Sequence, residues 1–432
     1  MSDERSTLLS RDSRVPSPPV PRCRSALEGG VISAVQSLSE RGGCGQGLRN
    51  YPSDSFVLEN LKIGVVAGNL DPRIGGGARF CREILTELIG RSGPEKHEWV
   101  IFGEGRKEAR LPESTAFRWK KVPGKNLGEH LFSRELNILA REVDKERCSL
   151  VWFVGGGGFP DPVSCPYLAT VWDIQHRTHP YLPEMQEGEE WAYREKKTAP
   201  FLRQAAGIIV GTQEGAGEIR NFYGISEDRM LFLPHPAPQG FKGVRTEVHP
   251  PFFLYPANFW PHKNHATLVR ALALLKRREV GLVFTGEGKN RSFLQDLVGR
   301  LGLEERVKFV GHVDDQELSR LYLSATALVY ASLSGPENLP PLEAMAAGCP
   351  VLNSDFPGAR EQLGEAALFV PPLDPSAWAA AMEEVLKAAG EGSIATRVGQ
   401  GRRLVQNRTP SSYVDGVLKW IEGFGATRSL WA

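Results

Sequence analysis

The chain has 432 residues and a formal net charge of +1, from 52 basic Lys and Arg residues against 51 acidic Asp and Glu residues. At about 150 residues per domain, this length predicts two or three domains with real cores and excludes a small disulfide scaffold. The balanced charge also excludes nucleic acid as a partner, because neutralising phosphates requires a clustered surplus of Lys and Arg.

The cysteines and the apolar runs indicate a reducing compartment. The six cysteines lie far apart and form no C-x-x-C pair, so neither a zinc site nor a redox pair is predicted. No apolar run approaches the ~20 residues that would span a bilayer, and the first residues lack the apolar core of a secretory signal. We expect a cytoplasmic protein, either free or at the periphery of a membrane.

Residues 1–56 differ in composition from the rest of the chain. They contain eleven serines and a Pro-rich run at 16–19, without a sustained apolar period. Such a segment cannot bury enough surface to offset the entropy of ordering, so we predict a disordered N-terminal tail. A transit peptide is disfavoured because the segment also carries acidic residues.

From residue 57, short β-rich runs alternate with apolar residues at helical spacing, which predicts an α/β fold with parallel strands. The first unit is a strand at 62–67, a glycine loop at 75–77 and a helix whose inner face runs from Phe80 to Leu88. The elements predicted next are a helix at 132–143 and strands at 149–154, 167–171, 207–210 and 230–233. A Pro-rich segment at 234–251 follows, so we predict one domain at 57–247 and a second at 248–405.

The same alternation restarts after this linker, so the two halves of the chain are predicted to be similar. The predicted strands are 252–256, 281–285, 307–310, 327–331 and 350–353. The predicted helices are 266–276, 292–298, 315–324, 342–347 and one containing Trp378 to Leu386. The C-terminal segment 406–432 is predicted to contain a last helix, apolar on one face between residues 413 and 421, that could pack on either half.

Ligands of open α/β sheets bind at the carboxyl ends of the strands, and one loop predicted there carries Lys263. A lysine before a helix can reach a phosphate beside the helix N-terminus. At about 4 Å and an effective dielectric near 20, one such pair is worth roughly 4 kcal/mol before desolvation costs. A solvated lysine beside a turn proline is the alternative interpretation.

A second such loop, at 334–341, leads into a helix that carries Glu343. We expect Glu343 in the first turn of this helix, where the helix dipole stabilises a carboxylate. A carboxylate there can accept hydrogen bonds from two neighbouring sugar hydroxyls. The alternative is a glutamate that only complements the dipole.

Four motifs of the second half occur together: Lys263-Asn264-His265, Gly286-Glu287-Gly288, Val310-Gly311-His312-Val313 and the run from Leu339 to Val351. Their order and context resemble those of the retaining nucleotide-sugar glycosyltransferases of family four, which have the GT-B fold. The resemblance extends from about Lys62 to the C-terminus and is more specific in the second half. It implies two Rossmann-like domains facing a central cleft, with the acceptor on the first and the nucleotide-sugar donor on the second.

The resemblance also implies roles for individual residues. Lys263 would bind the donor diphosphate, Glu343 the ribose, and Val313 the base through its backbone. The donor-binding residues that it implies are Gly76, Gly77, Asn258, Lys263, Gly286, Val313, Gly335, Asn338, Leu339 and Glu343. The catalytic candidates are Lys263, Glu337, Asp173 and His176; the last two lie where the family approaches the acceptor, and a structural hydrogen-bonding role is their alternative.

Three positions depart from the family pattern. Many members have a Glu at the position of Gly335, an Arg at that of Asn258 and a His at that of Trp172. Either Glu337, the nearest carboxylate, or backbone amides would replace the carboxylate missing at Gly335. These changes bear on the donor sugar and on how it is activated.

We therefore expect a retaining glycosyltransferase that moves a sugar, mannose by the resemblance, from a nucleoside-diphosphate sugar to a hydroxyl of a glycan or lipid-linked acceptor. The chain contains no D-x-D, so no metal and no other cofactor is expected, and Lys263 with helix amides would stabilise the leaving diphosphate. The alternatives are a catalytically degenerate sugar-nucleotide-binding protein and a GT-B sugar-nucleotide epimerase. An oxidoreductase fits less well, because the loop at 75–77 lacks the third glycine of G-x-G-x-x-G.

Overall fold

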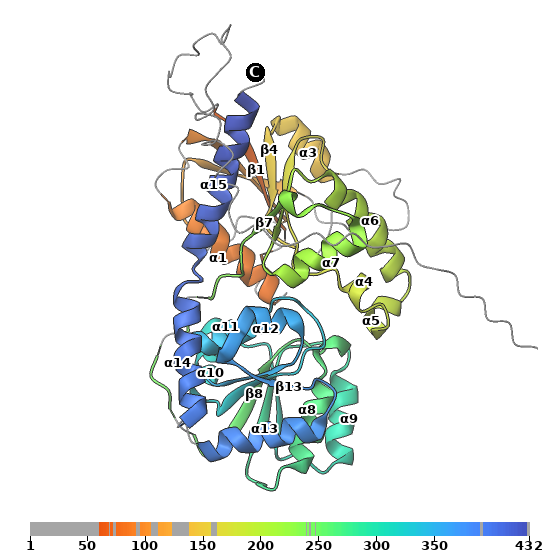
Figure 1. The fold of residues 1–432 in the computed structure, drawn as a ribbon, viewed down its shortest axis with the longest axis vertical. Coiled ribbons are helices and arrows are strands. Elements are labelled where there is room, and N and C mark those ends of the chain that lie inside the picture. The colour runs from red at the N-terminus through yellow and green to blue at the C-terminus, as the bar shows by residue number, and fades with distance from the viewer. Residues whose placement is uncertain are drawn as a thin grey trace, which may run out of the picture. The chain divides into compact units, whose positions relative to one another are not determined.

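The computed structural model describes residues 60–68, 70–71, 75–91, 96–104, 111–122, 138–156, 162–238, 240–241, 243–246, 248–388 and 392–429. The tail predicted at 1–56 lies outside the described residues. Residues 57–432 form one unit, and its strands assemble into two parallel sheets flanked by helices (Figure 1). The predicted α/β fold with two Rossmann-like halves is confirmed.

The first sheet has seven strands in the order β3-β2-β1-β4-β5-β6-β7, and every neighbouring pair is parallel. The strands are β1 (Lys62–Gly68), β2 (Glu98–Glu104), β3 (Phe117–Val122), β4 (Leu150–Phe153), β5 (Tyr167–Thr170), β6 (Gly207–Val210) and β7 (Met230–Phe232). The helices of this half are α1 (Gly76–Gly90), α3 (Ile138–Glu146), α4 (Gln175–Thr178), α5 (Pro183–Gln186), α6 (Glu190–Gln204) and α7 (Gln213–Tyr223). The strand order reverses between β1 and β4, which is where a parallel sheet opens a crevice for a ligand.

Helices cover both faces of this sheet, so its central strands are buried throughout. In β4, Leu150 and Trp152 pack in a cluster with α1, whereas Val151 and Phe153 pack on the opposite face with α3, α6 and α7. Successive side chains of a strand point to opposite faces of the sheet. Because both faces are buried here, every residue of β4 is apolar.

The second sheet has six strands in the order β10-β9-β8-β11-β12-β13, again all parallel. The strands are β8 (Phe252–Pro256), β9 (Gly281–Thr285), β10 (Val307–Gly311), β11 (Ala327–Tyr330), β12 (Val351–Ser354) and β13 (Leu368–Val370). The helices are α8 (His265–Leu274), α9 (Arg291–Arg300), α10 (Asp315–Ser324), α11 (Leu339–Ala346), α12 (Pro357–Leu363), α13 (Pro375–Ala388) and α14 (Gly392–Gln406). The strand order reverses between β8 and β11, and the loops after these two strands carry Lys263 and residues 331–338.

The last helix, α15 (Pro410–Ser429), returns to the first half. Its residues Val414, Val417 and Ile421 are buried in the same cluster as Leu85 of α1, and Figure 1 shows α15 running beside α1. The chain therefore crosses between the halves twice, after β7 and after α14. The two crossings are joined by a hydrogen bond from the Ala237 amide to the Arg408 carbonyl at 2.8 Å.

Several elements were not predicted from the sequence, namely β2, β3, α4, α5, α6, α7, α12, β13 and α14. Strand β3 lies at the edge of the sheet and alternates without a fully buried face, and α6 contains Pro200 and few apolar residues. The helix predicted at 132–143 is observed from Ile138 onward as α3, and its earlier positions lie outside the described residues.

Helix α12 begins against the loop 334–338 of the cleft, and this contact gives a test of the packing. A Cβ atom at Gly358 would lie 2.7 Å from the Cα atom and 2.9 Å from the carbonyl oxygen of Pro336. We expect Gly358→Ala to lower the free energy of unfolding by about 1–3 kcal/mol, because backbone on both sides must shift. Urea unfolding measures this change.

Gly217→Ala is the matched control in α7, where a Cβ atom would approach the end of the flexible Arg220 side chain, with its Nη2 atom at 3.9 Å. There alanine is expected to stabilise the helix, by up to about 1 kcal/mol. A Gly358→Ala protein as stable as the unaltered protein would contradict the described packing of α12.

Candidate active site

The strand ends of both halves open onto one cleft of about 730 Å³. Twelve of the thirteen predicted site residues line it: Gly76, Gly77, Asp173, Asn258, Lys263, Gly286, Val313, Gly335, Glu337, Asn338, Leu339 and Glu343. His176 does not line this cleft. The tertiary structure therefore brings together residues from both halves of the chain, as the resemblance implied.

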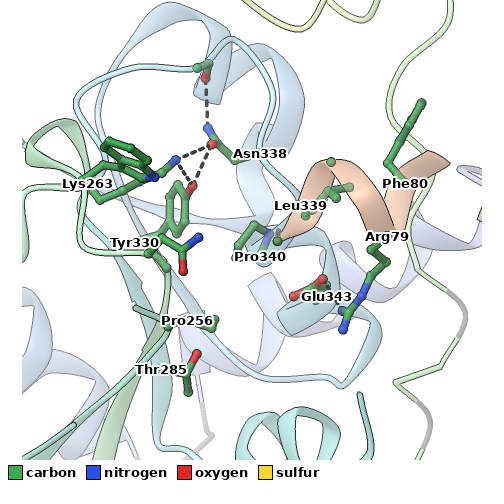
Figure 2. Close-up of a pocket in the computed structure, with 18 of the residues that line it drawn as sticks. Arg79, Phe80, Pro256, Lys263, Thr285, Tyr330, Asn338, Leu339, Pro340 and Glu343 are labelled. Atoms are coloured by element: carbon green, nitrogen blue, oxygen red, sulfur yellow. Dashed lines mark hydrogen bonds and ion pairs between the residues drawn. The ribbon is translucent and has the colours of Figure 1, made fainter. Parts of the chain in front are cut away.

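Lys263 ends a short 3-10 helix, η4 (Pro261–Lys263), that follows β8. Its Nζ atom donates to the Tyr330 hydroxyl at 2.9 Å and lies 3.4 Å from both Ser332 Oγ and Asn338 Oδ1 (Figure 2). All three partners are neutral, and within the described part of the chain no carboxylate forms an ion pair with Lys263. The ammonium group thus places a positive charge in the cleft that the protein does not neutralise locally.

Asn338 fixes the loop that faces Lys263. Its Nδ2 atom donates to the Gly335 carbonyl at 3.0 Å, and its Oδ1 atom accepts from the Tyr330 hydroxyl at 2.7 Å. Gln362 of α12 holds the Asn338 backbone from behind, with both hydrogen bonds at 3.0 Å. Gly335 has a φ of 105°, a conformation that a glycine adopts without strain.

Glu343 is buried at the other part of the cleft, with a side chain 5% exposed. Arg79 Nη1 of α1 donates to its Oε1 atom at 2.7 Å, and the Tyr322 hydroxyl donates to its Oε2 atom at 2.7 Å. The expected position in the first helical turn is wrong: α11 begins at Leu339, so Glu343 lies in the second turn. Direct partners from two other helices, rather than the end of the helix dipole, orient this carboxylate.

Glu337 lies where the two chain crossings meet. Its Oε1 atom accepts from the His235 backbone amide at 2.9 Å and is 3.6 Å from Arg408 Nη1, and its side chain is only 4% exposed. Although Glu337 borders the cleft, these contacts tie it to the linker and to the segment before α15. The geometry supports a structural anchor rather than a free replacement for the carboxylate missing at Gly335.

Asp173 and His176, predicted together, occupy different environments. Asp173 lines the cleft, and its Oδ1 atom accepts from the Gln175 amide at 3.0 Å. His176 is 1% exposed, with its Nε2 atom 3.0 Å from the Tyr223 hydroxyl and 3.3 Å from Glu195 Oε2. Burial lowers the pKa of His176 despite the nearby Glu195 carboxylate, which supports its structural alternative.

The remaining predicted donor residues lie at the mouths of β8, β9 and β10. Asn258 Oδ1 accepts from the Glu287 amide at 3.1 Å, so Asn258 holds the loop after β9. The Gly286 amide donates to the Gly311 carbonyl at 2.8 Å, which fixes the end of β9 beside β10. Val313 lines the cleft just beyond β10.

The glycines that start α1 permit close packing on the first half. A Cβ atom at Gly77 would lie 2.6 Å from the Trp172 ring, so Trp172, which stands where many family members have a His, fills the space above the glycine. A Cβ atom at Gly76 would lie 3.3 Å from Leu339 Cδ1 of the second half. The start of α1 is thus a wall of the cleft that touches both halves.

Sequence reasoning missed several residues of the cleft, chiefly Arg79, Gln175, His262 and Tyr330. His262 directly precedes Lys263 and lies across from α5, where Glu184 Oε1 accepts from its Nδ1 atom at 2.5 Å and from its backbone amide at 3.1 Å. Burial is the main cause that lowers the pKa of His262, followed by the adjacent Lys263. The position of His262 inside the lysine motif was an available signal, whereas nothing in the local pattern marks Arg79.

Comparison of the structure with solved proteins gives the class of fold. Sucrose-phosphate synthase from Thermosynechococcus elongatus matches with a TM-score of 0.68 and 19% identity, over 85% of this chain and 100% of that one. At this identity the likeness shows the fold alone. The chain has the GT-B fold.

Comparison of the sequence shows which known proteins the second half resembles. Residues 240–401 match the family described as "Glycosyl transferases group 1". The chain is 34% identical to the O-antigen chain mannosyltransferase RfbU of Salmonella typhimurium over 134 residues, which are 31% of this chain and 38% of that protein. It is 28% identical to O-antigen chain mannosyltransferase B of Escherichia coli over 232 residues, 50% of this chain and 61% of that protein.

The matches thus span less than two thirds of these two relatives. Residues 240–401 are therefore similar to the group 1 glycosyltransferases, and this match confirms the resemblance to the family-four enzymes.

Two further expectations concern metals and membranes. Within the described ranges, no three His, Cys, Asp or Glu side chains are grouped so that they could bind a metal ion. Among the same residues, no helix combines the length and apolar character needed to cross a bilayer. The absence of a cofactor, the cytoplasmic location and any contact with a membrane surface stay predictions.

Glu218 of α7 gives a pH-dependent test of the wall behind the cleft. Burial, together with Glu214 and Asp173, raises the pKa of Glu218 from 4.5 to about 8. Between these values the unfolded chain releases a proton that the folded protein retains, so stability is lost as the pH rises from about 4.5 to about 8. We expect Glu218→Gln to raise the free energy of unfolding at pH 8 by on the order of 1 kcal/mol, after allowance for partial solvent exposure.

The same variant at pH 5 is the control, because Glu218 is protonated there in the folded protein and Gln resembles a protonated Glu. Urea unfolding at both pH values measures the difference. An equal effect at the two values would contradict the buried position of this carboxyl.

Proposed function

We propose that the protein is a retaining glycosyltransferase that moves a sugar from a nucleoside-diphosphate sugar to a hydroxyl of a glycan or lipid-linked acceptor. The observation that carries this proposal is the Lys263 ammonium, which lies in the cleft among neutral oxygen atoms. A cation held in such a site attracts an anion, and the diphosphate of a donor is the anion that suits a glycosyltransferase domain.

A nucleoside diphosphate can extend from Lys263 toward Glu343. In Figure 2 these two residues lie on either side of Asn338, Leu339 and Pro340. We assign the diphosphate to Lys263 and the ribose hydroxyls to the Glu343 carboxylate. The base would then lie at the ends of β9 and β10, beside Gly286 and Val313.

The proposed reaction proceeds on one face of the donor sugar. The acceptor hydroxyl oxygen bonds to the anomeric carbon while the bond from that carbon to the β-phosphate oxygen breaks. The proton of the hydroxyl passes to the departing phosphate oxygen, and Lys263 stabilises the negative charge that grows on the diphosphate. Attack from the side of the leaving group retains the anomeric configuration.

The environment of Glu337 supports this route over a covalent intermediate. A covalent route requires a carboxylate nucleophile placed against the anomeric carbon. Glu337 already accepts a hydrogen bond from the His235 amide and lies near Arg408. Asp173, on the wall of the first half, is better placed to contact the acceptor.

We propose mannose as the transferred sugar, because two relatives of this chain are named mannosyltransferases. We propose also that no metal takes part, since Lys263 can supply the charge that a cation would supply to the diphosphate. GDP-mannose is therefore the first donor to test, followed by UDP- and ADP-sugars.

A protein that binds sugar nucleotides without transferring them is the second candidate. It is favoured by Asn258 and Gly335, which carry no charge where many family members have an Arg and a Glu. Incubation of each donor with and without an acceptor panel, followed by product analysis, separates the candidates. Binding without any new product favours this second candidate, and a changed sugar on the same nucleotide would indicate an epimerase.

Lys263→Ala tests the central assignment. Because the ammonium stabilises charge that develops during the reaction, we expect kcat to fall roughly 10²- to 10³-fold, as for the loss of one oxyanion donor. Initial rates of nucleoside diphosphate release measure the effect. The fold of the variant is checked by its melting temperature.

Lys289→Ala is the matched control, since Lys289 is 82% exposed and pairs with Glu187 on the surface. Its kcat should stay within about twofold of the parent. Parental turnover by folded Lys263→Ala protein would remove Lys263 from the mechanism.

A further inference from the structure

Arg79 of α1 reaches from the first half of the molecule onto two carboxylates of the second. Its Nη1 atom donates to Glu343 Oε1 at 2.7 Å, and its Nη2 atom forms an ion pair with Asp315 at the start of α10. Figure 2 shows the Arg79 side chain leaving α1 toward Glu343. One guanidinium group thus joins the wall of the acceptor half to the carboxylate assigned to the ribose.

The surroundings of Arg79 restrict its guanidinium to this position. Its side chain is 13% exposed, and its Cζ atom lies 5.3 Å from the centre of the Phe241 ring. Arg82, on the same helix, approaches Asp315 Oδ2 at 3.6 Å. The planar fork of an arginine can bond to two carboxylates at once, which a lysine cannot do with the same geometry.

The contacts of Glu343 leave room for a ligand. A carboxylate has about four lone-pair positions, and each oxygen of Glu343 accepts one hydrogen bond from the protein, from Arg79 or from Tyr322. Among the described residues, no other donor occupies the second lone pair of either oxygen. Two neighbouring hydroxyls of a ribose match this pair of free positions without displacing Arg79.

We propose that Arg79 is a positioning residue for the nucleotide, acting through Glu343. It holds the carboxylate in the orientation that receives the two ribose hydroxyls, and it ties the start of α1 to the donor half. The inference rests on the proposed function, because it requires that Glu343 binds ribose. It goes further in making the nucleoside site depend on both halves of the molecule.

Under this proposal the two residues affect different parts of the donor. Arg79 affects binding of the ribose through Glu343, whereas Lys263 binds the diphosphate. Loss of Arg79 should therefore weaken the binding of a nucleoside diphosphate and leave the binding of inorganic pyrophosphate unchanged. A merely structural arginine would weaken the binding of both ligands together.

Isothermal titration calorimetry of the full chain tests this inference. The probes are UDP or GDP, whichever the unaltered protein binds more tightly, the 2′-deoxy form of that nucleotide, and pyrophosphate. For Arg79→Ala we expect the Kd of the ribonucleotide to rise roughly 10- to 100-fold, and that of pyrophosphate to stay within about twofold. The preference for the ribo form over the 2′-deoxy form should shrink in the variant, because both changes remove the same interaction.

Further variants serve as controls for the effect of Arg79→Ala. Asp315→Asn keeps the contact between Arg79 and Glu343, so it should raise the ribonucleotide Kd less than Arg79→Ala does. Arg91→Ala is the matched control at the other end of α1, where Arg91 pairs with Asp415 and Glu87 away from the cleft; it should bind every probe as the parent does. If Arg79→Ala does not fold, Arg79→Lys replaces it, with the same order of effects on the three probes.

The outcomes distinguish this inference from the function on which it rests. An unaltered protein that binds no nucleotide and no pyrophosphate overturns both. A protein that binds nucleotide as proposed, but whose folded Arg79 variants bind it equally well or more tightly, overturns the role of Arg79 alone. An equal loss of nucleotide and pyrophosphate binding also overturns it.

Discussion

The carboxylates and the lysine of the cleft differ in how their charges are paired. The buried carboxylates Glu343 and Glu337, which border the cleft, are matched with Arg79 and Arg408, and the exposed Asp315 also pairs with Arg79. Lys263 is surrounded by the neutral oxygen atoms of Tyr330, Ser332 and Asn338 instead. Because an unpaired charge in a partly buried site is costly, a bound anion would complete this arrangement.

The same pairs connect the two halves. Arg79 belongs to the first half and its carboxylate partners to the second, while Glu337 of the second half accepts from His235 in the linker. Glu184 of α5 and His262 beside Lys263 form another such contact. Residues that would bind the donor are therefore positioned by groups on the opposite side of the cleft, so separation of the halves would disturb the site directly.

Two residues that depart from the family pattern, Trp172 and Asn258, have structural roles beside the cleft. Trp172 packs on Gly77 and forms a T-shaped contact with Phe80, with ring centroids 5.5 Å apart, so its volume shapes the wall of the cleft on the first half. Asn258 uses its side-chain oxygen to hold the loop after β9. In both cases a residue with a different chemistry supports the backbone around the cleft, and Lys263 Nζ lies 3.4 Å from Asn338 Oδ1.

The local sequence pattern was enough to predict the fold class, most strands of the second half and two of the site residues. The alternation of apolar runs and helical spacing gave the α/β class and most strands of the second half, because strand and helix periods depend on neighbouring residues. The loop motifs located Lys263 and Glu343 for the same reason, because each motif follows a strand and leads into a helix. The edge strand β3 and the Pro-containing helix α6 escaped prediction because tertiary packing, rather than a clear period, stabilises them.

Only the tertiary structure decided how these residues are used. It buried His176 beside Tyr223, tied Glu337 to the chain crossings, and placed Glu343 under direct contact with Arg79. Arg79 and Glu343 are 264 positions apart in the chain, and Glu337 and His235 are 102 apart. Contacts over such separations arise when two sheets and their crossing segments assemble, and no local sequence period records them.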